Sequence, residues 1–307
     1  MRSKSSIFLP GACALLILFQ FISTETVKGQ DEGYRNPEQC KERRGLEYGG
    51  IAGIYFAGRA TADFYSGKPG NENNVEYIYN NKYMYDSIYE LLDATRIFII
   101  SEYPEKMKYN PAFSFGLFAK YDLDCRTGIY LQFSYARLTA KDVVSVEVDP
   151  PIDYLAEPDI RLFPILGTEE RNMIDLGFSH AFGNNKVARL ILGGGINMNN
   201  TLVKEHVLKV ESKDSKRERD FNLVNVYGSN TYVPGGTQQA YEMRQGGIGF
   251  GIFGTVGVRL EFSPLIAIEP GFTFYYKQIA IEPKSGFTPH MNFYLRLCFR
   301  DLISFSE

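Results

Sequence analysis

The sequence contains no tryptophan, three histidines and four cysteines among its 307 residues. The histidines, at positions 180, 206 and 290, are far apart, and none has a neighbour suited to share a metal ion. No two cysteines have the CxxC spacing of a zinc site. We therefore expect no metal site, no haem and no other cofactor.

An excess of charge of either sign is also missing. The chain has 33 lysines and arginines against 36 aspartates and glutamates, a formal net charge of -3. Proteins that bind nucleic acid usually carry a basic patch or stripe. The composition therefore gives no reason to expect a nucleic-acid partner.

Long apolar runs are limited to one, at the N-terminus. Arg2 and Lys4 precede an apolar stretch over residues 7–22, and Val27 and Gly29 are small enough for a signal peptidase to cut after them. The stretch is short and no anchor follows it, which favours a signal peptide over residues 1–29. The alternative is a buried N-terminal helix.

The rest of the chain can enter a membrane only through strands, because helices and closed barrels alone satisfy every backbone group in lipid. Its main signal is the alternation of apolar and polar residues with period two, which is typical of strands. Tyrosine and phenylalanine are abundant, as in the aromatic belts of membrane barrels. Eight segments alternate in this way: 50–63, 112–123, 128–138, 171–182, 186–198, 247–262, 265–279 and 287–299.

The connections between these segments alternate strictly between short and long. Short turns are expected around residues 124–127, 183–185 and 263–264, and the long connections are 65–111, 140–170, 199–246 and, somewhat shorter, 280–286. A soluble sandwich has no reason to sort its loops by length, whereas an outer-membrane barrel has tight periplasmic turns and long extracellular loops. We therefore predict an all-β fold, a closed antiparallel transmembrane β-barrel of eight strands, in the bacterial cell outer membrane. Its parts would be a periplasmic N-terminal segment (30–47), the barrel (48–300) and a C-terminal tail (301–307).

Two hairpins, over residues 112–138 and 174–197, and the closing strand NFYLRLCF carry a family resemblance. The chain resembles the small OmpX/OmpA-type outer-membrane β-barrels, in particular the PorT-like barrels, over residues 48–300. Such barrels often end on the aromatic residue of the last strand, whereas here Phe299 is followed by residues 300–307. The resemblance implies an accessory role in secretion or envelope assembly.

The polar face of the alternating segments is rich in charge. Eight strands leave an interior just wide enough for side chains to fill, and buried charges must pair. Because the signs nearly balance, we expect a salt-bridged plug rather than a proton path or a passive pore. The predicted luminal charge network comprises Arg59, Asp63, Lys120, Asp122, Asp175, Arg189, Arg259, Glu261, Glu269, Lys277 and Arg296.

Two motifs resemble a cofactor-binding or a catalytic pattern, but their positions in the predicted strands argue against both functions. Residues 249–254 match GxGxxG, but they lie inside an alternating strand rather than in a turn before a helix, so we expect no dinucleotide site. Ser179 and His180 could suggest a hydrolase, but adjacent strand residues face opposite sides of a barrel wall. His290 has Thr288 on the same face, which is a weak signal. We expect no catalytic activity; the alternative is a membrane-embedded hydrolase that modifies lipid A.

The long connections carry the distinctive composition. The second is acidic, and the third holds a charged run over residues 213–220 that we expect to be solvated. The first contains a tyrosine-rich stretch, followed by a predicted helix over residues 86–97. These tyrosines fit contact with a partner or glycan better than a core: Tyr77, Tyr79, Tyr83, Tyr85 and Tyr89.

Together these features predict a non-catalytic accessory or interaction component of envelope assembly or secretion. It would bind partners through its extracellular loops or its rim. The expected partners are outer-membrane lipid and lipopolysaccharide, and another outer-membrane or secretion-system protein.

Three cysteines remain after signal cleavage: Cys40, Cys125 and Cys298. In the predicted topology Cys40 and Cys125 both lie at the periplasmic rim, in an oxidising compartment, and Cys298 lies on the inward face of the last strand. We predict a Cys40–Cys125 disulfide, with three free thiols as the alternative.

Overall fold

The computed structural model describes residues 45–80, 82–95, 98–149, 157–183, 187–212, 214, 216–224, 245–263, 265–281 and 286–300. All of them belong to one compact unit, Lys41–Glu307. The predicted signal peptide and C-terminal tail lie outside the described residues, as does the predicted N-terminal segment except for its last residues.

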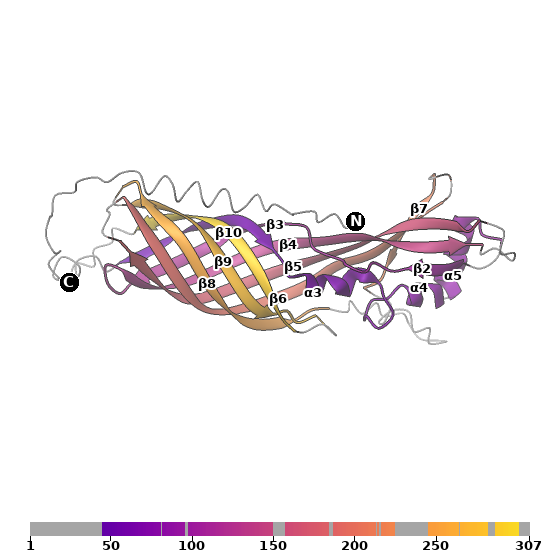
Figure 1. Cartoon of the computed structure of the whole chain (residues 1–307), viewed down its shortest axis with the longest axis horizontal. Helices are drawn as coiled ribbons and strands as arrows, with labels where there is room; N and C mark the ends of the chain where they lie inside the picture. Colours follow the sequence, from indigo (N-terminus) through magenta and orange to yellow (C-terminus); the bar gives the residue numbers. More distant parts are fainter. Residues whose placement is uncertain are drawn as a thin grey trace, which may run out of the picture. The chain divides into compact units, whose positions relative to one another are not determined.

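Eight strands in the described residues form a closed ring in which every neighbouring pair is antiparallel (Figure 1). The first strand pairs with both the second and the last, and the pairing of β4 with β5 closes the ring. The predicted eight-stranded barrel is therefore confirmed. Its strands are β1 (Leu46–Phe56), β3 (Ala112–Asp122), β4 (Thr127–Val148), β5 (Asp159–Phe182), β6 (Ala188–Glu211), β8 (Ile248–Glu261), β9 (Ile266–Gln278) and β10 (Phe287–Arg300).

The period-two pattern places apolar side chains on the outside of the ring. On β8, Ile252 is 60% exposed, whereas its neighbour Phe253 is 7% exposed and points inward. The same outward apolar row continues on every strand of the ring, for example at Leu117, Leu176 and Leu295. An apolar outer wall around a closed ring is the arrangement required for a strand structure in lipid.

Three strands are far longer than the alternation predicted. β4 has 22 residues and β5 and β6 have 24 each, so all three continue past the ring. The prediction that residues 140–170 and 199–246 are loops was thus wrong for most of their described length. The outward side chains there are often charged, which hid the pattern, while the inward ones, such as Val146 and Leu208, are fully buried.

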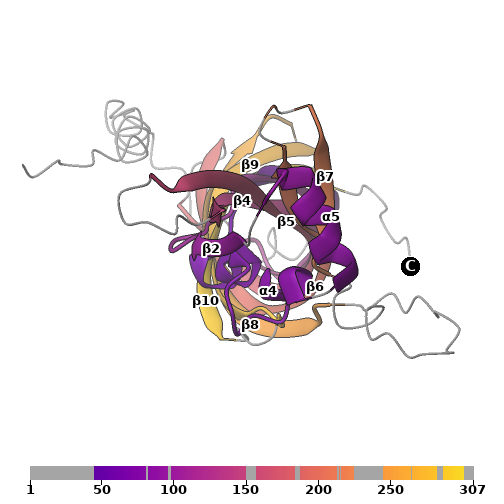
Figure 2. The same ribbon diagram turned by 90° about the vertical axis from the view of Figure 1, so that its right-hand side faces the viewer.

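Beyond the ring, these extensions become the middle of a five-stranded sheet. β2 (Phe98–Glu102) pairs with β4, and β7 (Glu218–Asn222) pairs with β6. Two helices, α4 (Glu76–Asn80) and α5 (Lys82–Leu92), lie at this end, where Figure 2 shows them in front of the sheet. None of the described helices has the length and apolar composition needed to cross a membrane.

We call this part of the chain the cap: the described residues of 67–110, 139–169 and 203–224. Ile78 and Ile88 of its helices share one hydrophobic core with Val144, Ile165 and Leu208 of its sheet. The cap is therefore a folded structure whose core continues into the mouth of the barrel. The barrel carries it on the end opposite the short connections that follow β3, β5 and β8.

The segment between β1 and the cap folds over the barrel mouth. It contains a helical turn, α3 (Arg59–Ala62), and a 3-10 turn, η1 (Asp63–Ser66), which ends at Gly67 with a left-handed φ of 69°. Phe64 and Tyr65 of η1 are fully buried in the core that the cap shares with this end of the barrel. The first strand therefore ends at Phe56, seven residues before the predicted end at Asp63.

Candidate functional site

The lumen near the short turns is filled by ion pairs centred on Arg259. Its guanidinium donates to Glu269 Oε1 at 2.7 Å and to Glu47 Oε2 at 2.9 Å, and it also bonds Glu47 Oε1. Glu261 lies 3.3 Å from Arg259 Nε and pairs with Arg189. Arg259, Glu47 and Glu269 are all buried, so each charge is neutralised by direct contact rather than by water.

Glu47 of β1 is shared by cations from three other strands. Besides Arg259 it pairs with Arg300 Nη2 at 2.9 Å and Lys120 Nζ at 3.7 Å, and Lys120 also pairs with Asp122 at 2.9 Å. These contacts link β1, β3, β8 and β10 across the barrel. Ion-paired side chains therefore fill the lumen at this end of the barrel.

Asp175 occupies the middle of the barrel. It accepts hydrogen bonds from Asn197 Nδ2 at 2.5 Å, Tyr275 Oη at 2.9 Å and Gln132 Nε2 at 3.3 Å. Gln132 in turn accepts from Arg296 Nη2 at 2.7 Å. Gln132 thus connects the central carboxylate of Asp175 to Arg296.

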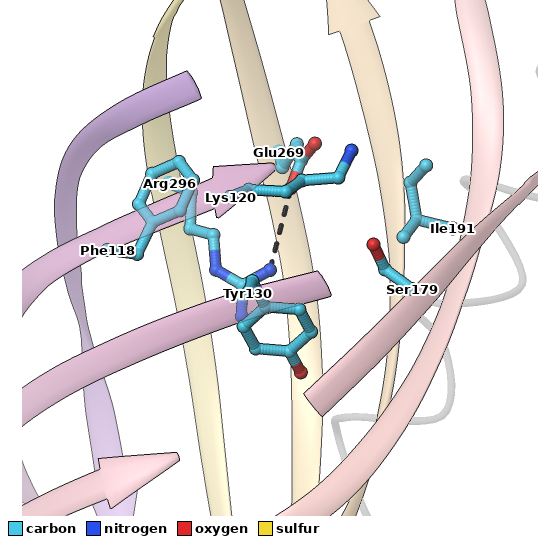
Figure 3. Close-up of a pocket in the computed structure, with 7 residues that line it drawn as sticks. All are labelled: Phe118, Lys120, Tyr130, Ser179, Ile191, Glu269 and Arg296. Atoms are coloured by element: carbon cyan, nitrogen blue, oxygen red, sulfur yellow. Dashed lines mark ion pairs between the residues drawn. The ribbon is translucent and has the colours of Figure 1, made fainter. Parts of the chain in front are cut away.

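Arg296 borders a small hollow on the inner wall, shown in Figure 3. Arg296 is ion-paired with Glu269 at 3.6 Å and lies over the Tyr294 and Tyr130 rings, at 4.5 and 5.0 Å from their centroids. The hollow is too narrow to admit a water molecule; it is lined by Phe118, Lys120, Tyr130, Ser179, Ile191, Glu269 and Arg296.

The mouth of the barrel is closed by a second buried network, around Arg171. This fully buried side chain pairs with Glu169 at 2.5 Å and donates to Thr61 Oγ1 at 3.1 Å and Tyr55 Oη at 3.3 Å. The hydroxyl of Tyr65 donates to Glu169 Oε2 at 2.8 Å. Because Thr61 and Tyr65 belong to α3 and η1, these bonds fasten that segment across the mouth.

Nine of the eleven predicted network residues line the lumen and take part in its contacts, and Arg59 and Asp63 do not. Because β1 ends at Phe56, Arg59 is an exposed residue of α3, and Asp63 pairs with Lys68 at 3.2 Å outside the barrel. Their assignment to the lumen was wrong. Lys277, by contrast, is fully buried, with Nζ 2.9 Å from Met173 Sδ and 4.5 Å from the Tyr275 ring.

Sequence reasoning missed four charged residues of these networks: Glu47, Glu169, Arg171 and Arg300. Glu47 was assigned to the segment before the barrel, and Glu169 to a loop. Both lie on the inward side of strands that extend further than predicted. Continuing the alternation of β1 backward from Ile51 to Glu47 could have found the first of them.

The geometry separates the residues that could suggest a hydrolase. Ser179 is buried and points into the lumen, whereas His180 lies on the outer side, where its Nδ1 is 2.9 Å from Thr127 Oγ1. His290 and Thr288 do share a face, and Thr288 Oγ1 lies 2.8 Å from His290 Nε2. His290 Nδ1, however, accepts a hydrogen bond from the Gly58 amide at 2.9 Å, so this pair belongs to the closed mouth of the barrel. The GxGxxG match lies within β8, where Gly251 leaves room for Lys277.

The tyrosines of the first connection take part in the cap core. Tyr77, Tyr79, Tyr85 and Tyr89 are partly buried against it, and the Tyr85 and Tyr79 rings lie 4.9 and 4.8 Å from the Phe98 ring. The interpretation that they fit a partner better than a core was wrong for these four, because the extended sheet provides a surface for them to cover. The side chain of Tyr83 lies outside the described residues.

The cysteines are partly described. Cys125 is disulfide-bonded, and its partner lies outside the described residues, as does Cys40. Cys298 is a free, buried thiol on β10. The pairing of Cys40 with Cys125 therefore stays a prediction.

The described chain thus defines a class: a small eight-stranded β-barrel of the outer-membrane type, with a filled lumen, a closed mouth and a folded cap. No family model matches the chain, and no curated protein matches it.

Among solved structures, the chain is similar to the outer membrane protein OprG of Pseudomonas aeruginosa, with 9% identity, a TM-score of 0.37, and 84% of this chain and 97% of that one covered. It is also similar to Neisserial surface protein A, with 8% identity, a TM-score of 0.36, and coverage of 83% and 96%. A third is Ail, the attachment invasion locus protein of Yersinia pestis, with 7% identity, a TM-score of 0.31, and coverage of 83% and 97%. The assignment to this class rests on the strand pairing of this chain itself.

Proposed function

We propose that this protein is a non-catalytic component of the bacterial outer membrane whose barrel anchors the cap outside the cell. The cap or the barrel rim binds a partner, either lipopolysaccharide or another outer-membrane or secretion-system protein. The observation that carries this proposal is the division of the molecule: a lumen filled by buried ion pairs, and a folded cap with an apolar core on the end opposite the short turns.

The barrel architecture supports the placement. Outer-membrane barrels have short turns on the periplasmic side, so the cap would face outward. Its extended sheet carries exposed apolar side chains well beyond the ring, and one of them, Ile99 at 46% exposed, belongs to the edge strand β2. An exposed apolar side chain on an edge strand is a place where a further strand can pack.

An accessory role in envelope assembly or secretion is the finer part of the proposal, and it follows from the resemblance to PorT-like barrels. The test is purification of the tagged full-length protein from membranes in mild detergent. A partner of the cap should be recovered with the wild type and lost with Leu208→Ala, which opens the cap core and leaves the barrel intact. Equal recovery with both proteins would contradict binding through the cap.

The rival function is hydrolysis of lipid A within the membrane. The opposite orientation of Ser179 and His180 argues against it. Mass spectrometry of lipid A from cells with and without the protein should show identical acyl chains. A pore is tested separately: the purified protein in planar bilayers should give no steady single-channel current.

A further inference from the structure

The cap sheet has two edge strands, and their side chains differ in how strongly they discourage the pairing of a further strand. β7 presents Glu218, Arg219 and Asp220, all exposed. Charged side chains on an edge discourage the pairing of a further strand. β2 has the sequence FIISE, with a single charge at its end, and within the described residues it pairs only with β4. Within the described residues the outer edge of β2 therefore offers unpaired backbone donors and acceptors. Its short length and the bulge between Ile100 and Glu102 limit strand addition, but no row of charges does.

Both faces of the sheet beside this edge carry side chains that the side chains of an added strand could contact. On the outer face, Ile99 is 46% exposed and stands opposite Glu147 of β4, while Glu102 stands opposite Ser145. On the inner face, Phe98 stacks on Tyr85 at 4.9 Å. An added strand would place alternate side chains against Ile99 and Glu102 on one face and toward the Phe98 side on the other.

Two tyrosine hydroxyls near the end of β2 have unused hydrogen-bonding capacity. Tyr79 Oη and Tyr103 Oη are buried atoms with no hydrogen-bond partner among the described residues. Burial, and then the neighbouring Tyr103, raise the pKa of Tyr79. Buried hydroxyls without partners are uncommon in folded proteins, so the apolar side of the sheet beside β2 holds two unused donors.

Building on the proposed function, we propose that the outer edge of β2 binds an extended segment of another protein by strand addition. Such a segment would have an apolar residue facing Ile99 and a basic residue facing Glu102. No lysine or arginine lies in β2 or at residues 143–148 of β4, so the charged side chains of these two paired segments, Glu102 and Glu147, are both negative. Main-chain hydrogen bonds supply the affinity in this mode of recognition, and alternate side chains supply the specificity.

Membrane geometry favours a foreign strand over a second copy of this chain. Two copies in one membrane are related by a two-fold axis along the membrane normal, and β2 runs roughly along the barrel axis in Figure 1. Rotation about an axis parallel to a strand preserves its direction, so the two β2 edges would meet in parallel. Antiparallel pairing, which is slightly more stable per residue, needs a partner that is free of this constraint.

The test uses the full-length protein in detergent and a fluorescein-labelled peptide, RVTVTVR, as a generic strand with basic ends. Fluorescence anisotropy should show saturable binding to the wild type, and Ile99→Lys should weaken it about tenfold by guarding the edge. The matched control is Leu162→Lys, because Leu162 is exposed on the same face but belongs to the interior strand β5. It should bind the peptide as the wild type does.

A second peptide, with alternate backbone nitrogens methylated, tests the hydrogen bonds without any change to the protein. It should lose most of its affinity. Equal binding of the methylated peptide, equal weakening by Leu162→Lys, or no binding to the wild type would each overturn strand addition. A cellular partner that is still recovered with Ile99→Lys would also overturn it, while leaving the proposed function intact. If no specific partner is recovered with the wild type, the proposed function fails, whatever the peptide does.

Discussion

The same three strands enclose two different interiors. Where β4, β5 and β6 belong to the ring, their inward side chains are polar, as at Gln132, Asp175 and Asn197. Where they belong to the cap, the inward side chains are apolar, as at Val146 and Leu208. The surroundings of the outer face account for the reversal: lipid requires apolar side chains outside the ring, whereas in water the cap must bury its apolar side chains inside.

The two interiors are consequently stabilised by different interactions. The lumen depends on charges that compensate each other, and loss of one member leaves its partners buried without compensation. The cap depends on apolar burial, where each truncation costs transfer free energy and leaves a cavity. Mutations in the two regions should therefore differ in size and in which part of the molecule they affect.

The sharpest test of the comparison is whether the cap and the short turns lie on opposite sides of the membrane. A cysteine at Ser145 of the cap should react with a membrane-impermeant maleimide in intact cells, and one at Ser263 in a short turn should not. The expected difference is all or none, because the barrier is the bilayer itself. Labelling of both positions, or of Ser263 alone, would reverse or remove the proposed orientation.

The largest effect on stability is expected from Arg259→Met. It leaves Glu47 and Glu269 buried beside one cation fewer, at a cost of about 3–5 kcal/mol. The measurement is the temperature at which the barrel loses its compact migration on detergent gels. Lys209→Met is the control, since it breaks an exposed pair with Asp220 worth about 0–1 kcal/mol. Similar melting of both variants would mean that the luminal ion pairs do not stabilise the barrel.

In the cap, Leu208→Ala should cost about 2–5 kcal/mol, because the side chain is fully buried in its core. The effect should be local. Proteases should cleave the cap faster while the barrel keeps its compact migration on gels. Leu162→Ala, at a 60% exposed position of the same sheet, should change neither. Loss of the barrel along with the cap would show that the two interiors form one cooperative unit.

The barrel could be predicted from the sequence because its signal is local. Alternation and loop lengths are read from neighbouring residues, and they identified all eight strands of the ring. The cap was missed because its pattern is mixed: Glu147 and Lys209 face outward beside Val143 and Leu162, so polar and apolar residues share one face. Arg59 fits the alternation of β1 in the sequence, but the strand ends before it. The chain turns into the barrel mouth there because of tertiary hydrogen bonds, such as the one that Arg171 donates to Thr61 Oγ1, which local sequence does not reveal.

The smallest expected effect is a dependence of cap stability on pH, caused by His206. This side chain is fully buried beyond the ring, where its Nε2 donates to the Tyr65 carbonyl at 3.1 Å, and its Nδ1 has no partner among the described residues. Burial lowers the pKa of His206 from 6.5 to about 3, although the bond to Tyr65 favours the charged ring. Above pH 6.5 the ring is neutral in both the folded and the unfolded state, so it adds no pH dependence there.

As the pH falls from 6.5 towards 3, the unfolded chain gains a proton that the folded cap cannot accept, so the cap loses stability. At pH 5 the loss is about 2 kcal/mol. Urea unfolding followed by tyrosine fluorescence should therefore show a lower midpoint for the cap at pH 5 than at pH 7.5. His206→Gln keeps a donor for the Tyr65 carbonyl but does not titrate, so it should reduce this difference. If the wild type and the Gln variant shift equally with pH, then groups other than His206 cause the dependence.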